Sequence, residues 1–203
     1  EKSLKLKREV DDATDSSSDS DSEDEKSKRP NKQTNFFIDS EEEAKFHTKP
    51  IKIGEGGTSI TYKVVDTRTK VPMCKKVLKY NKGQMTIKDA QNALKEFEVL
   101  YSITHPCICK AIGINIQEEI EITNNEGDQE EITTIALFLE YLDYNLIDIL
   151  NKNISNTSKV AIVIDICHAM NFLHKRGMIH RDLKIENIML NSLFQTKLVD
   201  FGL

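Results

Sequence analysis

The sequence predicts an α+β fold, in which a five-stranded antiparallel sheet with one helix is followed by a mainly helical segment. Two observations predict the first part: short apolar segments alternate with polar residues between positions 51 and 78, and a helical spacing of apolar residues follows. A long helical pattern at positions 158–173 predicts the second part. The 203 residues suffice for one ordinary domain with a core and a tail.

The composition excludes several classes of protein. A hydrophobic share of 38% and a charged share of 30% are typical of a soluble globular chain, and a net charge of -5 gives no reason to expect nucleic-acid binding. No run of eighteen apolar residues predicts a membrane span. The first ten residues lack both an initiator Met and an apolar signal core, so we expect a processed or partial chain in the cytoplasm, with the nucleus as the alternative.

Residues 1–45 differ from the rest and predict a disordered tail. The segment Asp11–Glu25 holds eight acidic residues and five serines, without a basic residue, so it cannot bury enough apolar surface to order itself. One interpretation is a solvated linker. The other is a regulatory tail that contacts partners, because its serines lie among acids that suit acid-directed kinases: Ser16, Ser17, Ser18, Ser20 and Ser22.

The folded domain is expected from residue 46 onward and begins with a meander of three strands. Ile51 and Ile53 alternate with polar residues before a glycine-rich turn, the alternation resumes over residues 60–64, and residues 71–78 give a third strand. A capping box at residues 86–89 then predicts a helix to about residue 101. Two more strands are expected at residues 111–122 and 132–139, with residues 118–131 as an extended hairpin loop.

The predicted helix at Ser158–Leu173 carries five apolar residues assigned to one side: Ile162, Val163, Ile166, Met170 and Leu173. The four cysteines lack zinc-site spacing and are expected to be reduced thiols: Cys74, Cys107, Cys109 and Cys167.

The most specific motif lies near the end of the chain. Residues 180–187 read His-Arg-Asp-Leu-Lys-Ile-Glu-Asn, and Asp200-Phe201-Gly202 begins thirteen residues after Asn187. The glycine-rich turn Gly54-Glu55-Gly56 lies between two predicted strands, which argues against a dinucleotide-binding turn, where a helix follows. Together these motifs resemble the eukaryotic protein kinase family, from about residue 49 to residue 203. The resemblance implies a small lobe at about 46–139, a hinge at 140–142 and a partial large lobe at 143–203.

The resemblance also implies the residues that transfer phosphate. Asp182 is expected to align the substrate hydroxyl and accept its proton, and Lys184 to steady the γ-phosphate of ATP. Asn187 and Asp200 are expected to hold Mg²⁺. Lys75 matches the strand lysine that orients the phosphates, with Lys76 as the alternative. The helical glutamate that pairs with this lysine is assigned to Glu96, with Glu98 as the competing residue.

The nucleotide site implied by the resemblance has a lid and a hinge. The backbone of Glu140 and Leu142 is expected to hydrogen-bond adenine, Leu139 to be the gatekeeper, and Met189 to form the floor. Two departures from the family pattern stand out: Ser59 replaces the third glycine of the lid, and Met73 takes the position of an alanine against adenine. The lid and upper pocket are assigned to Gly54, Glu55, Gly56, Gly57, Thr61 and Met73.

The order Asp-Leu-Lys-x-x-Asn resembles that of serine/threonine kinases, which implies transfer to Ser and Thr hydroxyls of protein substrates. Residues 164–174 resemble the tyrosine-kinase-like group. Because the chain stops after the metal-binding motif, we expect a truncated catalytic domain whose helix at residues 158–173 exposes apolar surface. A non-catalytic nucleotide-binding scaffold (a pseudokinase) and a truncated remnant that never folds are the alternatives.

Overall fold

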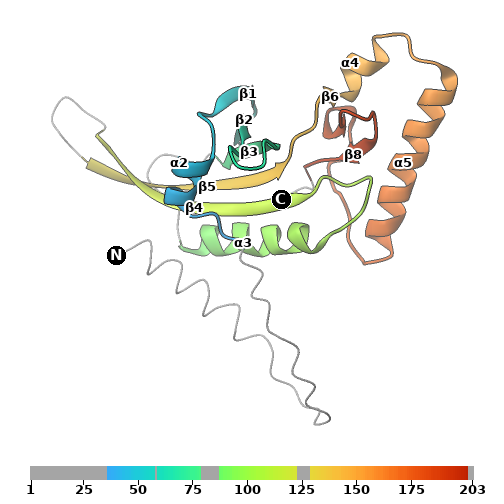
Figure 1. Cartoon of the computed structure of the whole chain (residues 1–203). Coiled ribbons are helices and arrows are strands. Elements are labelled where there is room, and N and C mark those ends of the chain that lie inside the picture. Colours follow the sequence, from blue (N-terminus) through green and yellow to red (C-terminus); the bar gives the residue numbers. More distant parts are fainter. Residues whose placement is uncertain (1–35, 58, 79–86, 123–128, 201–203) are drawn as a thin grey trace, which may run out of the picture.

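The computed structural model describes residues 36–57, 59–78, 87–122 and 129–200 and consists of a sheet-based lobe and a mainly helical lobe (Figure 1). Several expectations lie outside these residues: the acidic segment of the tail, the first residue of the capping box, the tip of the long hairpin, and Phe201 with Gly202.

The first lobe contains the predicted five-stranded sheet. Its strands are β1 (Ile51–Glu55), β2 (Ser59–Val65), β3 (Pro72–Leu78), β4 (Ala111–Ile122) and β5 (Gln129–Glu140). Every neighbouring pair is antiparallel, and the order β1-β2-β3-β5-β4 leaves β1 and β4 at the edges. The expected hairpin loop at residues 118–131 is shorter than predicted, because cross-strand pairing continues to the pair Ile122 and Gln129.

Helices cover the two faces of this sheet. Helix α3 (Ile87–Ser102) packs on the face that we call the inner face, where its buried side chains meet β4 and β5 (Figure 1). Helix α2 (Ser40–Phe46) lies on the opposite, outer face (Figure 1). The main core lies between α3 and the inner face, and a smaller apolar cluster lies on the outer face: Val64, Met73, Ala136 and Phe138.

Helix α2 shows that ordered structure begins before residue 46, where the folded domain was expected to start. Asp39 caps the helix through a 2.8 Å hydrogen bond that its side chain accepts from the Glu41 backbone N–H. Before the cap, Phe36, Phe37 and Ile38 pack against the sheet lobe. Burial of these three apolar residues offsets the cost of ordering the acidic residues that follow them.

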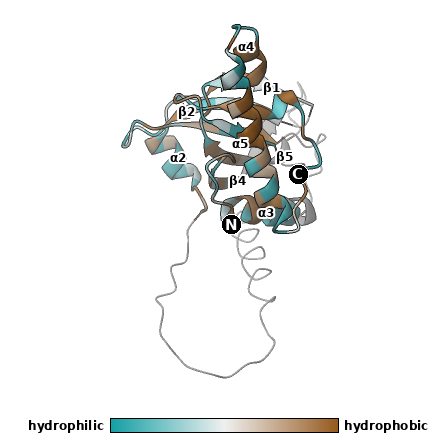
Figure 2. Cartoon of the chain, turned by 90° about the vertical axis from the view of Figure 1, so that its right-hand side faces the viewer, coloured by the Kyte–Doolittle hydropathy of each residue, from teal (hydrophilic) through white to brown (hydrophobic). Residues whose placement is uncertain are grey.

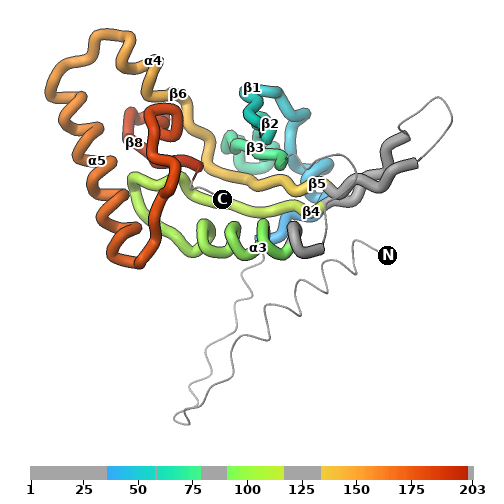
Figure 3. The backbone as a smooth tube through the Cα atoms, turned by 180° about the vertical axis from the view of Figure 1, so that it is seen from behind, coloured from blue at the N-terminus to red at the C-terminus, as the bar shows by residue number. Residues whose placement is uncertain are grey.

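The second lobe contains a short helix, a long helix and a small sheet that lies between the long helix and the first lobe (Figures 1 and 3). Its helices are α4 (Leu146–Leu150) and α5 (Asn156–His174), and its three strands are β6 (Tyr144–Asn145), β7 (Ile188–Leu190) and β8 (Thr196–Leu198). Ser155 caps α5, and Gly177, at φ 71°, reverses the chain after it. This reversal directs the chain to the motif at residues 180–187.

The predicted long helix is confirmed as α5, and part of its predicted apolar side is wrong. Ile162, Ala169 and Leu173 are buried against the second lobe, whereas Val163 is 57% exposed. Val160 and Ile164 are exposed as well, so the helix presents apolar surface to solvent as expected (Figure 2). Among the described residues, no helix combines the length and apolar character needed to cross a membrane.

Candidate functional site

Asp182 lies in a loop whose polar side chains converge on its carboxylate. The Asn187 side-chain amide donates to the Asp182 backbone carbonyl at 2.9 Å and to its carboxylate at 2.8 Å. The Lys184 ammonium lies 2.8 Å from the same carboxylate. Hydrogen bonds from Lys184 and then Asn187 lower the pKa of Asp182, so the exposed carboxylate stays ionised. Asn187 itself is buried in the 3₁₀ turn η1 (Ile185–Asn187) and fixes this geometry.

Backbone contacts hold this loop against Asp200. A ring nitrogen of the fully buried His180 lies 3.1 Å from the Val199 carbonyl, and the Val199 N–H donates to the Asn187 carbonyl at 3.0 Å. Asp200 follows directly and has φ 51°, a left-handed conformation that costs free energy in a residue with a side chain. Pairing between β7 and β8 fixes both segments, so the structure brings Asp182, Asn187 and Asp200 to one region.

The two adjacent lysines of β3 point to opposite faces of the sheet. Lys76 is on the inner face, and its Nζ lies 2.5 Å from Asp200 Oδ1. Lys75 is on the outer face, where its largely buried ammonium pairs with Glu43 of α2 and lies 5.8 Å from the Phe138 ring centroid. The structure therefore does not bring Lys75 to Asp200, because side chains alternate along a strand. The alternative residue, Lys76, occupies the inner position.

The same alternation corrects the expectation for Met73. Met73 is buried in the outer cluster with Val64, so it cannot approach a ligand on the inner face. Cys74 faces inward instead, beside the cluster that contains Leu139 and Leu142. Burial raises the pKa of the Cys74 thiol to about 11. All four cysteines are free, as predicted: Cys74, Cys107, Cys109 and Cys167.

Glu96 lies on α3 directly before the fully buried Phe97. Desolvation raises the pKa of its carboxyl, and the positive charge of Arg181 opposes that rise. Among the described residues no ion pair joins Glu96 to Lys75 or Lys76, since Lys76 pairs with Asp200. Glu96 is thus placed near the Arg181–Asn187 loop without the expected lysine partner.

The glycine-rich turn joins β1 to β2 as predicted. Glu55, Gly56 and Gly57 are exposed and Gly54 is half-buried, and the Gly56 N–H donates to the Ser59 carbonyl at 2.9 Å. A Cβ added at Gly57 would meet no atom within 4 Å. Open backbone of this kind leaves room for a ligand to approach. Ser59 starts β2 opposite Leu78 and is buried, and Thr61 pairs with both Gly54 and Lys76.

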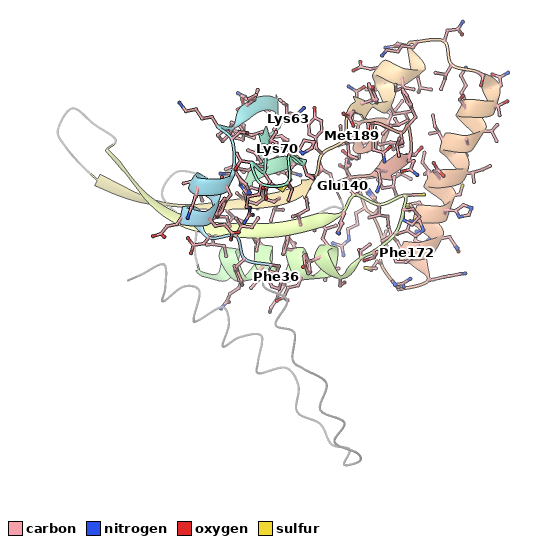
Figure 4. All side chains as sticks on the ribbon, in the orientation of Figure 1. Phe36, Lys63, Lys70, Glu140, Phe172 and Met189 are labelled. Carbon is pink, nitrogen blue, oxygen red and sulfur yellow. The ribbon has the colours of Figure 1, made fainter. Side chains whose placement is uncertain are left out.

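The segment after β5 connects the two lobes (Figure 4). The Glu140 carboxylate accepts from the Lys110 backbone N–H at 2.7 Å and from Lys197 Nζ at 2.9 Å, and the Glu140 N–H donates to the Lys110 carbonyl. These contacts fix the strand end. Leu142 is buried, and Met189 packs against the same cluster from β7, so the structure brings both to one apolar region with Cys74.

Sequence reasoning missed two contributors to this region. Cys74 was passed over because Pro72–Leu78 contains apolar residues on both faces, so the period of two gave no preferred face. The pair of Glu140 with Lys197 joins residues 57 positions apart, and a single sequence offers no signal for it.

The chain is similar in sequence to known protein kinases. The family pattern described as "Protein kinase domain" matches residues 47–203. The chain is 29% identical over 157 residues to cyclin-dependent kinase G1 of Arabidopsis thaliana, covering 75% of this chain and 24% of that protein. It is 28% identical over 166 residues to the ovarian-specific serine/threonine-protein kinase Lok of Drosophila melanogaster, covering 75% and 31%.

A third relative is the stress-activated protein kinase JNK of Drosophila melanogaster, 27% identical over 170 residues, covering 84% of this chain and 42% of that protein. The chain thus spans less than half the length of each of these relatives. None of their names refers to the tyrosine-kinase-like group, so that assignment gains no support.

Proposed function

Because the chain belongs to the protein kinase family, we propose that it supplies the ATP site and catalytic loop of a serine/threonine protein kinase. The observation that carries the proposal is the convergence of the Asp182–Asn187 contact and the Lys76–Asp200 pair at the junction of the lobes. A phosphoryl group in transfer carries negative charge, and catalysis consists mainly of positioning and neutralising it.

We propose these roles for the residues. Asp182, ionised and oriented by the Asn187 amide, accepts the proton of the substrate hydroxyl. Lys184, at the same carboxylate, is placed to steady the transferred phosphate. Lys76, in place of Lys75, orients the phosphates of ATP, and Glu96 is its partner once Asp200 is engaged elsewhere.

The oxygen donors near Asp200 fit Mg²⁺. The Asp200 carboxylate is half exposed. Asn187 donates its amide nitrogen to Asp182, so its amide oxygen is the atom that would bind the ion. Within the described residues, no cluster of three or more His, Cys, Asp or Glu side chains forms a complete metal cage. This matches Mg²⁺, which binds through one or two protein oxygens together with phosphate. The ion neutralises phosphate charge when bound; Asp200 and Asn187 are the residues that would hold it.

The apolar region formed by Leu142, Met189 and Cys74 is proposed to receive adenine. Glu140 and Leu142 supply the backbone for its polar edge, because the Glu140 side chain is already held by Lys110 and Lys197 and keeps that segment in place. The glycine-rich turn between β1 and β2 is proposed to cover the phosphates of ATP. Cys74 takes the role that the sequence assigned to Met73.

A substitution that keeps the size of the side chain and removes its negative charge tests the proposed reaction. In the full-length protein, Asp182→Asn is expected to lower phosphate transfer by about 10²–10⁴-fold, because the proton acceptor is lost. Binding of ATP with Mg²⁺ should persist, since Lys76 and the adenine region are unchanged. A radiolabelled transfer assay on peptides containing Ser, Thr or Tyr gives both the rate and the acceptor.

The alternative is a non-catalytic nucleotide-binding scaffold. The absence of an ion pair between Lys76 and Glu96 among the described residues favours it. Nucleotide binding without transfer by the unchanged protein would establish the scaffold, whereas transfer that survives Asp182→Asn would contradict the proposed role of that residue.

Three further assignments remain proposals. A reducing compartment, the cytoplasm or the nucleus, is supported by the four free thiols and is tested by cell fractionation. Regulatory contacts through Asp11–Glu25 rest on its composition alone and are tested by phosphopeptide mapping of its serines. Membership of the tyrosine-kinase-like group rests on residues 164–174 alone.

A further inference from the structure

Residues Phe36–Thr48, which we call the strap, lie across the free edge of β4. The Ile38 N–H donates to the Ile114 carbonyl at 2.8 Å, and the Ile114 N–H donates to the Phe36 carbonyl at 2.9 Å. The strap therefore supplies a parallel partner to backbone groups that an edge strand otherwise leaves unpaired.

Gly113 shows that β4 is shaped to receive the strap. A Cβ added there would lie 2.6 Å from the Ile38 Cδ1 atom and 3.0 Å from the Phe36 carbonyl oxygen. The second of these neighbours is backbone, which cannot move aside as a side chain can. The register of β4 also shifts between Ala111 and Gly113, where the strap docks. A side chain at this position would therefore press on the strap, so its close approach favours glycine here.

The first residue of the strap reaches α3. The Phe36 ring centroid lies 5.5 Å from that of Phe97 and 5.4 Å from that of Tyr101, distances typical of packed aromatic pairs. Phe36 lies beside α3 in Figure 4. Phe97 is fully buried and directly follows Glu96, so a displacement of this helical turn also displaces the Glu96 carboxylate.

The other end of the strap is anchored on the outer face. Glu43 pairs with Lys75 and accepts a 2.9 Å hydrogen bond from Asn115, which ties α2 to β3 and β4. The Thr67 N–H donates to the Phe46 carbonyl at 2.7 Å and attaches the end of α2 to the turn after β2. Phe36 is thus the part of the strap that reaches α3, while its remainder is fixed to the sheet.

We propose that Phe36 is a positioning residue for Glu96: the strap holds α3 against β4 in a position from which Glu96 can approach Lys76 when ATP binds. This inference rests on the proposed function, because it assigns Glu96 the role of partner to the phosphate-orienting lysine. It accounts for three features together: the shaped site at Gly113, the aromatic contacts of Phe36, and the use of Lys75 as an anchor.

The test combines two measurements on the full-length protein. The first is hydrogen exchange of the α3 backbone amides in the unchanged protein, in Phe36→Ala and in Phe172→Ala. Phe172 is the control, because its ring is also partly buried but packs on Arg176 of the second lobe and on His105, which lies beyond the C-terminal end of α3 (Figure 4). Exchange in α3 is expected to rise in Phe36→Ala and to stay unchanged in Phe172→Ala.

The second measurement is the affinity for ATP with Mg²⁺ in Phe36→Ala, Glu96→Gln and the double variant. Phe36→Ala is expected to weaken binding by about 3- to 30-fold, the range for coupling through packed side chains. In the Glu96→Gln background the same change should have little further effect, because the group it positions has been removed. Phe36→Leu, which retains apolar volume, should recover most of the affinity.

Gly113→Ala is a second variant that disturbs the strap and keeps Phe36, in case Phe36→Ala does not fold. Its added Cβ is expected to displace the strap and to raise α3 exchange in the same way. Unchanged hydrogen exchange of α3 in both variants would overturn the inference. So would a loss of ATP affinity in the double variant equal to the sum, in free energy, of the losses in Phe36→Ala and Glu96→Gln. If the unchanged protein binds no ATP, the proposed function fails and the role at Glu96 with it, while the exchange data still report whether the strap holds α3.

Discussion

The two faces of β3 carry similar residues with different surroundings. The inner face has Cys74 and Lys76, and its lysine meets Asp200 across the junction of the lobes. The outer face has Met73 and Lys75, and its lysine meets Glu43 of the strap. Lys75 and Lys76 are neighbours in the chain, yet Lys76 faces the proposed ATP site and Lys75 anchors an N-terminal segment. A lysine at the expected distance from a motif can therefore be assigned a role only when the sheet face on which it lies is known.

Truncation of Met73 should give the largest effect on stability. Met73→Ala is expected to lower the free energy of unfolding by about 2–5 kcal/mol, because it empties a buried position in the outer cluster. The affinity for ATP should be retained in the folded protein. Urea unfolding and a binding titration measure the two quantities. A change in ATP affinity larger than that caused by Cys74→Ala would mean that Met73 lines the nucleotide site after all.

Ionisation of Cys74 should give a smaller effect on the inner face. The folded pKa is raised from 9.0 to about 11 by burial, so between these values the folded state binds more protons than the unfolded state. Stability should therefore fall as the pH rises from 9 toward 11. The measurement is urea unfolding at several pH values in parallel with Cys74→Ala. An equal pH dependence in both proteins would contradict a buried, inward-facing thiol.

Local patterns in the sequence predicted much of this architecture. Alternation located β1 and β2, a short apolar segment after a turn located β3, and helical spacing located α3 and α5. The motif at residues 180–187 located a loop that the structure builds around Asp182. These predictions succeed because each depends on residues that are neighbours in the chain. The short strands β6, β7 and β8 were missed, because two or three residues are too few to show a period.

The remaining differences depend on contacts between distant residues. Every residue from Pro72 to Leu78 is buried or half-buried, so no apolar alternation told Lys75 from Lys76; pairing with Phe138 and Leu137 decides their faces. Residues 36–45 of the strap lie within the predicted disordered tail, and their short apolar segment, residues 36–38, is followed by four acidic residues: Asp39, Glu41, Glu42 and Glu43. The order of the strap comes from Gly113 and α3, which lie far along the chain.

The most direct test of the roles assigned to the two lysines is the affinity for ATP with Mg²⁺, measured by equilibrium titration. It is measured in two single variants, Lys76→Ala and Lys75→Ala. We expect Lys76→Ala to weaken binding by about 10- to 100-fold, the loss of a charged hydrogen bond to phosphate. We expect Lys75→Ala to keep the affinity close to that of the unchanged protein and to lower the melting temperature, because Glu43 loses its ion pair and keeps only the hydrogen bond from Asn115. The reverse result, with affinity lost in Lys75→Ala and kept in Lys76→Ala, would contradict the assignment of the two faces.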